Sequence, residues 1–173
     1  MRKQKGFSLS ELLIVVAIIL IIAAIAIPNL LRARIAANEA SAASGIRTIN
    51  TAEVSFVSSY PVVGYSTTLA VLGDPGNICA AGTPVATNAC LLDNSLATAI
   101  AAPGKAGYHY LYAQVVNNGV GTGYQIVADP NRFNSTGVKA FCSFEDAVVR
   151  TDGGATAGTL TDAACIGTLT ALQ

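Results

Sequence analysis

The hydrophobic and polar positions divide the chain into three parts. Residues 12–27 are drawn only from Leu, Ile, Val and Ala, and residues 32–60 carry a sparse apolar stripe at helical spacing. Residues 108–151 hold β-branched and aromatic runs separated by Gly, Asn and Pro. This pattern predicts an α+β protein in which a long N-terminal α-helix packs on a small antiparallel β-sheet.

The first part is long and apolar enough to cross a membrane. A helix over residues 7–31 rises about 37 Å, which exceeds a bilayer core of ~30 Å and allows some tilt. The basic residues Arg2, Lys3 and Lys5 precede it and predict a cytoplasmic N-terminus. Pro28 removes one helical hydrogen bond, so we expect a kink just before it.

The helix is expected to continue through residues 32–60, where Pro61 stops it. Its apolar positions share one helical face and should contact a globular head. They are Ile35, Ala42, Ile46, Ile49, Phe56 and Tyr60. The charged residues of this amphipathic half are expected to lie largely outside that stripe. They are Arg32, Arg34, Glu39, Arg47 and Glu53.

The head is expected to span residues 61–173. Its first part, 61–107, reads as a loop with one short helix over 95–101 that is capped by Asp93 or Asn94. The sheet, 108–151, is expected to contain strands over 108–116, 124–128, 138–144 and 147–150. The motifs Asn117–Gly119 and Gly121–Gly123 predict the first turn. The tail, 152–173, carries few signals of regular structure.

The composition agrees with this division into an apolar N-terminal segment and a more polar remainder. Of the 173 residues, 52% are apolar and 12% charged, and the mean hydropathy of +0.52 reflects the N-terminal segment. Ten basic side chains balance ten acidic ones, but removal of Arg2, Lys3 and Lys5 leaves the rest mildly acidic. The bulk charge therefore gives no sign of a nucleic-acid-binding protein.

The four cysteines are Cys79, Cys90, Cys142 and Cys165. They form no CxxC motif and the chain has a single His, so a zinc site is not expected. An even number in an exported domain favours disulfides. Three pairings are possible, and the sequence neighbours Cys79–Cys90 and Cys142–Cys165 are preferred. The alternative is four unpaired thiols.

No catalytic constellation is present, so no enzyme activity, metal or cofactor is expected. His109 stands alone between tyrosines, without a nucleophile–base pattern. Four carboxylates are conceivable calcium ligands, but no 12-residue ligand loop surrounds them, which favours turn and cap roles. They are Asp129, Glu145, Asp146 and Asp152. Asn134-Ser135-Thr136 matches the short Asn-glycosylation pattern.

Glu11 is the candidate functional residue. A carboxylate among membrane-embedded apolar residues costs about 2.5–3.5 kcal/mol on insertion scales and is functional by default. The helix dipole offsets part of this cost, because Glu11 lies in the first turn. If the chain is cut after Gly6, Phe7 carries a free α-ammonium four residues before Glu11. That ammonium can pair with Glu11 of its own helix or of a neighbour; the alternative is a carboxylate at headgroup level without a partner.

Residues 5–19 and 26–30 resemble the N-terminal segment of type IV pilins and type II secretion pseudopilins. The resemblance covers about the first 60 residues, with Ser8-Leu9-Ser10 where the family usually has Thr-Leu. It implies that a prepilin peptidase removes leader 1–6 between Gly6 and Phe7 and N-methylates Phe7. Glu11 would then pair with the amine of a neighbouring subunit, and Pro28 would match the family's helix-bending proline.

The leading hypothesis is a pilin, the structural subunit of a type IV pilus for adhesion, twitching motility or DNA uptake. It would wait in inner-membrane lipid, be extracted by an assembly platform, and polymerise with itself and other pilins at the cell surface. One alternative is a type II secretion pseudopilin, although the head's cysteines and lack of a calcium pattern favour the pilus. Another is a singly anchored periplasmic binding or enzymatic domain that does not polymerise.

Overall fold

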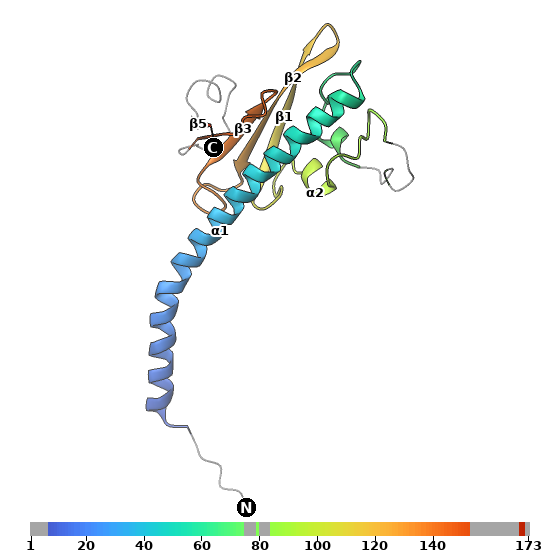
Figure 1. Cartoon of the computed structure of the whole chain (residues 1–173). Coiled ribbons are helices and arrows are strands. Elements are labelled where there is room, and N and C mark those ends of the chain that lie inside the picture. Colours follow the sequence, from blue (N-terminus) through green and yellow to red (C-terminus); the bar gives the residue numbers. More distant parts are fainter. Residues whose placement is uncertain (1–6, 75–78, 80–83, 153–169, 172–173) are drawn as a thin grey trace, which may run out of the picture. The chain divides into compact units, whose positions relative to one another are not determined.

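The computed structural model describes residues 7–74, 79, 84–152 and 170–171. The chain divides into two compact units, residues 1–34 and 35–173. The elements in chain order are α1 (Leu9–Ser59), η1 (Leu69–Leu72), α2 (Asn94–Ala97), β1 (Tyr108–Asn117), β2 (Val120–Pro130), β3 (Ala140–Phe144), β4 (Arg150–Asp152) and β5 (Thr170–Ala171) (Figure 1). A long N-terminal helix and an antiparallel sheet confirm the predicted α+β class.

In the first unit, α1 continues through Pro28 as one helix. The 16 consecutive apolar residues 12–27 give this helix apolar side chains on all of its faces. Such a helix must be surrounded by lipid or by other protein chains. The kink expected near Pro28 stays a prediction. The helix starts two residues later and ends one residue earlier than expected, at Leu9 and Ser59.

The sheet has the strand order β1-β2-β3-β4-β5, with every neighbouring pair antiparallel. β1 and β2 form a hairpin whose turn residues Asn118 and Gly119 have φ angles of 50° and 82°. Both need the left-handed region, which Asn and Gly tolerate best. The wider turn expected over Gly121–Gly123 is wrong: these residues belong to β2, where Gly121 exchanges hydrogen bonds with Val63 and Tyr65.

Other boundaries also differ from the expectation. The strand expected over 147–150 starts later: the Ala147 N–H closes a turn by donating to the Phe144 carbonyl at 2.9 Å, the next two residues are irregular, and β4 begins only at Arg150. The short helix ends at Ala97, four residues early, although Asp93 caps it as expected by accepting from the Leu96 N–H. In the tail, β5 pairs with β4 and was not anticipated.

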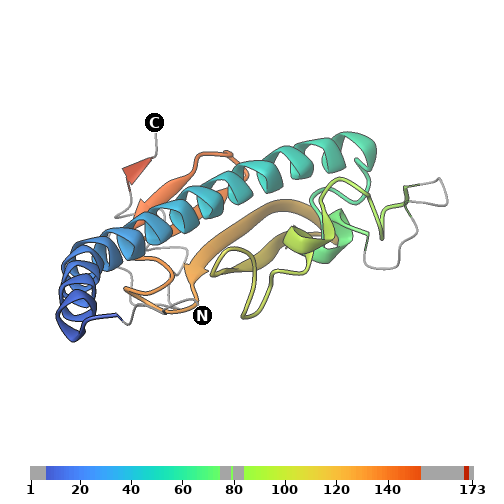
Figure 2. The same ribbon diagram turned by 90° about the horizontal axis from the view of Figure 1, so that it is seen from below.

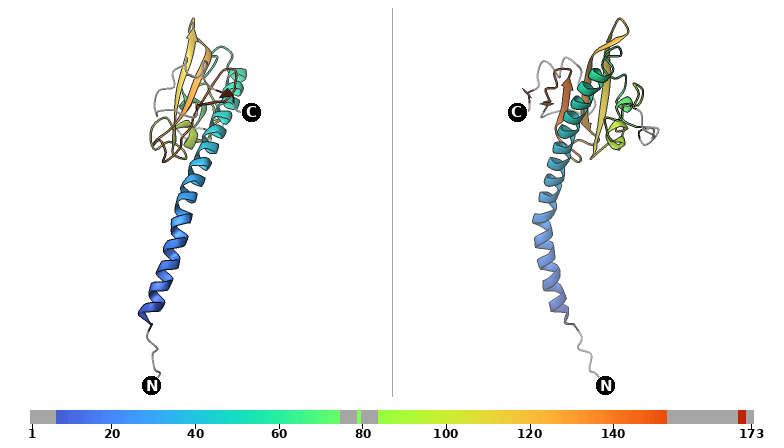
Figure 3. Two further views of the ribbon diagram at one scale, coloured as in Figure 1. Left: turned by 90° about the vertical axis from the view of Figure 1, so that its left-hand side faces the viewer. Right: turned by 45° about the vertical axis from the view of Figure 1, so that its right-hand side comes forward.

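The second unit buries its core between the sheet and residues 35–59 of α1, which lie along one face of the sheet (Figure 2 and Figure 3). Four of the six predicted stripe residues are buried, and Ile35 and Tyr60 are half-buried. From the sheet, Tyr110, Tyr124 and Ile126 complete this core, each at most 1% exposed. Burial raises the pKa of the Tyr110 hydroxyl to about 12.

The expectation that Glu53 lies outside the apolar stripe is wrong, because its side chain is fully buried. Its carboxylate accepts from the Tyr112 hydroxyl at 2.6 Å, from the Ser66 hydroxyl at 2.5 Å and from the Ser66 N–H at 3.1 Å. Burial and this neighbouring carboxylate raise the pKa of Tyr112. The three donors satisfy the buried charge and join α1 to β1 and to the segment that follows the helix.

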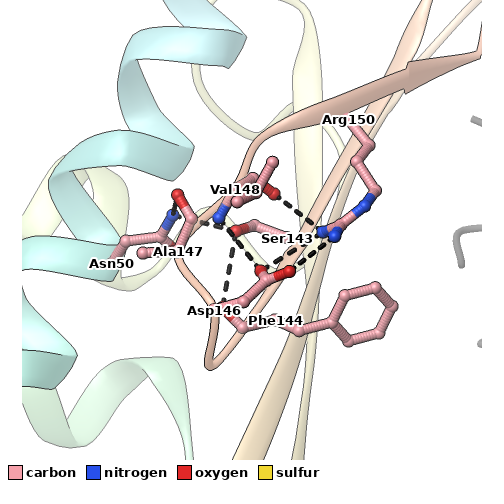
Figure 4. Close-up of polar contacts among 7 residues, drawn as sticks. All are labelled: Asn50, Ser143, Phe144, Asp146, Ala147, Val148 and Arg150. Atoms are coloured by element: carbon pink, nitrogen blue, oxygen red, sulfur yellow. Dashed lines mark hydrogen bonds and ion pairs between the residues drawn. The ribbon is translucent and has the colours of Figure 1, made fainter. Parts of the chain in front are cut away.

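Asn50 is a second buried polar residue of α1 that the stripe did not include (Figure 4). Its amide N–H₂ donates to the Ser143 hydroxyl at 2.9 Å and to the Ala147 carbonyl at 3.2 Å. Its amide oxygen accepts from the Tyr124 hydroxyl at 2.8 Å. Asn50 therefore holds α1 to β2, β3 and the turn after β3.

The structure contains the expected Cys79–Cys90 disulfide. Cys142 is fully buried in β3 and is disulfide-bonded. Its expected partner, Cys165, lies outside the described residues. The leader 1–6 with Gly6 and most of the tail also lie outside them.

Candidate functional site at the N-terminal segment

The Glu11 side chain caps the start of α1 by accepting from the backbone of Ser8. The Ser8 N–H donates to Glu11 Oε2 at 2.9 Å, while the Ser8 carbonyl accepts from the Glu11 N–H at 3.1 Å and the Leu12 N–H at 3.3 Å. The Ser8 hydroxyl also accepts from the Ser10 N–H at 3.4 Å. A Ser with a Glu three residues later is the sequence signature of a capping box. The arrangement starts the helix directly before the apolar run.

Phe7 immediately precedes this cap and is 80% exposed. Its peptide neighbour Gly6 lies outside the described residues, so the structure does not test the expected cleavage. Ser8 is the residue that follows Phe7, and its N–H is already bonded to Glu11. The Glu11 carboxylate is therefore held at the N-terminal end of α1, where the helix dipole favours its negative charge. A newly formed Phe7 amine would lie at the same end of the helix.

The apolar run behind the cap lacks a partner among the described residues. Each large apolar side chain from Leu12 to Ile27 is 44–65% exposed. By length and composition, α1 could cross a membrane. Exposed apolar surface of this extent must be buried in lipid or against other protein chains. The site therefore combines the Glu11 carboxylate with a large apolar surface that no described residue covers.

The remaining candidates have structural roles in the head. His109 Nδ1 lies 3.0 Å from Asn131 Oδ1, and the Asn131 amide donates to the Pro103 carbonyl at 2.7 Å. Asp146 pairs with Arg150 and accepts from the Val148 N–H at 3.0 Å (Figure 4). The hydrogen bond from Arg150 is the main reason that the pKa of Asp146 is lowered. Within the described residues, no three His, Cys, Asp or Glu side chains gather as a metal site would require.

Sequence reasoning identified Glu11 but missed its partner in the same chain. The signal was available, because Ser8-Leu9-Ser10-Glu11 matches the capping-box spacing. The expectation treated Glu11 only as a partner for the Phe7 amine. The structure shows that the carboxylate accepts from the Ser8 N–H, a backbone donor at the start of the helix that would otherwise lack an acceptor.

Comparison with known proteins places this segment in a defined class. Residues 1–27 match the family described as the prokaryotic N-terminal methylation motif. A stretch of 39 residues, 22% of this chain, is 67% identical to the type IV wide pilus major component PilA4 of Thermus thermophilus. A stretch of 56 residues, 32% of this chain, is 45% identical to the type IV major pilin protein PilA of Myxococcus xanthus.

These matches confirm the resemblance to type IV pilins at the N-terminal segment. They span only 30% of the length of PilA4 and 26% of the length of PilA. No solved structure matches the chain significantly. The head therefore has to be interpreted from its own structure.

Proposed function

We propose that this chain is a structural subunit of a type IV pilus, which polymerises through its N-terminal helix into a filament at the cell surface. The observation that carries the proposal is the capped Glu11 carboxylate in front of an exposed apolar helix, within a segment that matches the N-terminal methylation motif.

Removal of the leader between Gly6 and Phe7 would create the positive charge that Glu11 needs. In our proposal a prepilin peptidase cuts this bond and N-methylates the new Phe7 amine. Glu11 Oε2 already accepts from Ser8, whereas Oε1 accepts no hydrogen bond from the described residues. The carboxylate therefore has capacity for the ammonium of a neighbouring subunit without losing its cap.

Pairing of Phe7 in one subunit with Glu11 in the next is a heterologous contact, because different groups meet on the two chains. Repetition of such a contact generates an open helical polymer rather than a closed dimer. The charge pair would set the register, and the apolar residues from Leu12 to Ile27 would supply most of the contact area. Local loosening near Pro28 would let the helix adapt to its neighbours.

The subunit would pass through two environments. Before assembly, α1 would span the inner membrane with its basic N-terminus in the cytoplasm. An inner-membrane platform would then extract it, and the apolar surface would exchange lipid for other subunits. The test is whether filaments sheared from the cell surface contain this chain with Phe7 as its N-terminal residue; absence of the chain from such filaments would contradict the proposal.

A further inference from the structure

The loop between β2 and β3, residues 131–139, presents one aromatic and two basic side chains to solvent. Phe133 is 44% exposed, and Arg132 and Lys139 are also exposed. Exposed aromatic residues beside basic ones are typical of surfaces that lie at a membrane interface, where the ring enters the headgroup layer and the cations meet lipid phosphates. The way the loop is held and its place along the chain decide whether it could reach such an interface.

The loop is fixed by its own hydrogen bonds. The Thr136 hydroxyl accepts from the Arg132 N–H at 3.0 Å, and the Thr136 N–H donates to the Arg132 carbonyl at 2.9 Å. The Asn134 N–H donates to the Gly137 carbonyl at 2.9 Å. These bonds enclose Phe133 in a closed turn. Its exposure is a property of a structured loop, so little conformational entropy would be lost on docking.

The same loop is attached to α1 close to the end of the apolar run. Asn38 Nδ2 donates to the Thr136 carbonyl at 2.8 Å, and Glu39 Oε1 accepts from the Val138 and Lys139 N–H groups at 2.9 and 3.2 Å. Asn38 follows Leu31 by seven residues, which is about 10 Å of helix and at most about 25 Å of extended chain. A headgroup layer is roughly 5–7 Å deep on each side of the bilayer. The chain between the apolar run and Asn38 is therefore short enough for the loop to reach the membrane surface when the apolar run is inserted.

The charges of the loop are available to an outside partner. The ion pairs within the described residues join Lys105 to Asp93 and Arg150 to Asp146, so neither Arg132 nor Lys139 takes part in one. Glu39 contacts this loop, and its carboxylate accepts from backbone amides. The exposed groups thus combine positive charge with an apolar ring, which suits an anionic lipid surface.

We propose that the loop 131–139 docks on anionic phospholipid headgroups while the subunit is in the membrane, with Phe133 in the headgroup layer and Arg132 and Lys139 on lipid phosphates. This inference rests on the proposed function for one point, namely that the N-terminal helix is inserted in a bilayer. Docking would hold the head against the membrane before assembly and would have to be released on extraction.

The test uses the full chain and a single tryptophan. The natural chain has no Trp, so Phe133→Trp places one indole in the loop, and Val62→Trp places one at a matched control position that is 85% exposed beyond the end of α1. Each variant is reconstituted into vesicles of neutral phosphatidylcholine alone or mixed with anionic phosphatidylglycerol. Indole emission and its quenching by lipids labelled near the headgroup are then measured, after flotation has shown that the chain is inserted.

We expect the indole of the Phe133→Trp variant to be quenched and blue-shifted in anionic vesicles, and that of the Val62→Trp variant to emit as it does in water. Arg132→Glu or Lys139→Glu in the Phe133→Trp background should lower the docked-to-undocked ratio at least about fivefold per residue. High salt should also lower the docked-to-undocked ratio, because it screens the charges. Equal quenching of the two variants in anionic vesicles would overturn the proposal.

Three further outcomes also count against it, and a fourth contradicts the proposed function. Quenching of the Phe133→Trp variant that is the same in neutral vesicles would remove the role of the basic residues. An emission change in that variant that depends on the protein-to-lipid ratio, and not on anionic lipid, would assign the surface to a second copy of this chain. A chain that fails to float with vesicles would instead contradict membrane anchoring, and so the proposed function itself. A Phe133→Trp chain that floats without quenching contradicts only this inference.

Discussion

The Tyr112 hydroxyl on β1 donates a 2.6 Å hydrogen bond to the Glu53 carboxylate on α1. Together with two donors from Ser66, it makes a buried carboxylate the link between the helix and the sheet. Glu53→Leu would leave the Ser66 N–H without its acceptor, and the Tyr112 and Ser66 hydroxyls with the Ser66 and Thr68 carbonyls as acceptors. We therefore expect the head to lose about 2–4 kcal/mol of unfolding free energy. Urea unfolding of the detergent-solubilised chain, followed by near-UV circular dichroism, measures this.

Two variants serve as controls for Glu53. Glu53→Gln keeps one acceptor oxygen and should cost less than the Leu variant. Arg47→Ala changes an exposed residue of the same helix and should lie within about 0.5 kcal/mol of the natural chain. A Leu variant as stable as the natural chain would show that this hydrogen-bonded link does not stabilise the head.

Gly45 and Tyr110 define a second helix–sheet contact. A Cβ at position 45 would overlap the Tyr110 hydroxyl. Gly45→Ala gains about 1 kcal/mol of helix propensity but loses about 1–3 kcal/mol to overpacking, so we expect a net loss of stability of about 1 kcal/mol. The Tyr110 hydroxyl has no hydrogen-bond partner among the described residues. Tyr110→Phe should therefore relieve the overlap at little cost.

A double-mutant cycle of these two positions gives the coupling directly. Gly45→Ala combined with Tyr110→Phe should be more stable than Gly45→Ala alone, as measured by the urea midpoint. If Gly45→Ala by itself raises the midpoint, helix propensity dominates and the close approach of Tyr110 is not limiting.

Stability should fall at alkaline pH because of the buried tyrosines. Burial raises the pKa of Tyr110 from 10.0 to about 12, so the folded state holds its proton more tightly than the unfolded chain does. This contribution is present below pH 10 and is lost as the pH rises from about 10 through about 12, by about 2–3 kcal/mol. Urea unfolding at about pH 8, 10 and 11.5 tests it, and Tyr110→Phe should show a shallower decline. A pH-independent midpoint across this range would contradict the expectation.

Substitutions can separate the cap that Glu11 forms with the Ser8 N–H from its proposed pairing with the Phe7 amine. Glu11→Gln keeps an oxygen for the Ser8 N–H and removes the charge, whereas Glu11→Ala removes both and also costs about 1 kcal/mol of helix capping. If pairing with the Phe7 amine sets the register, both variants should insert in the membrane and lose surface filaments, as counted by electron microscopy. Normal filament numbers from Glu11→Gln would mean that capping alone is required.

The sequence predicted the helix and the sheet because both rest on local periodicity. It singled out Glu11 as a candidate because its charge lies at the start of an apolar run, and the role of Glu11 in assembly stays a prediction. Glu53 was missed because polar residues were assigned to the solvent. Its position nevertheless fits the stripe, since the steps from Ile49 to Glu53 and from Glu53 to Phe56 are four and three residues. Whether a carboxylate at such a position is buried depends on donors from distant segments, here Tyr112 and Ser66, and local patterns do not contain that information.

The errors in the sheet have a similar origin. Gly121 and Gly123 were interpreted as turn residues, but the tight turn needs only Asn118 and Gly119. Gly121 remains in β2 because it exchanges backbone hydrogen bonds with the segment after α1. A glycine selected for close approach of two backbones has the same appearance in a sequence as one selected for a turn.

The central claim is that this chain is processed at Gly6–Phe7 and assembled through the resulting amine. Mass spectrometry of the N-terminal peptide from sheared surface filaments tests it most directly. The account predicts a peptide that begins at Phe7 and carries one added methyl group on its amine. A peptide that still begins at Met1, recovered from cells with an active prepilin peptidase, would contradict it.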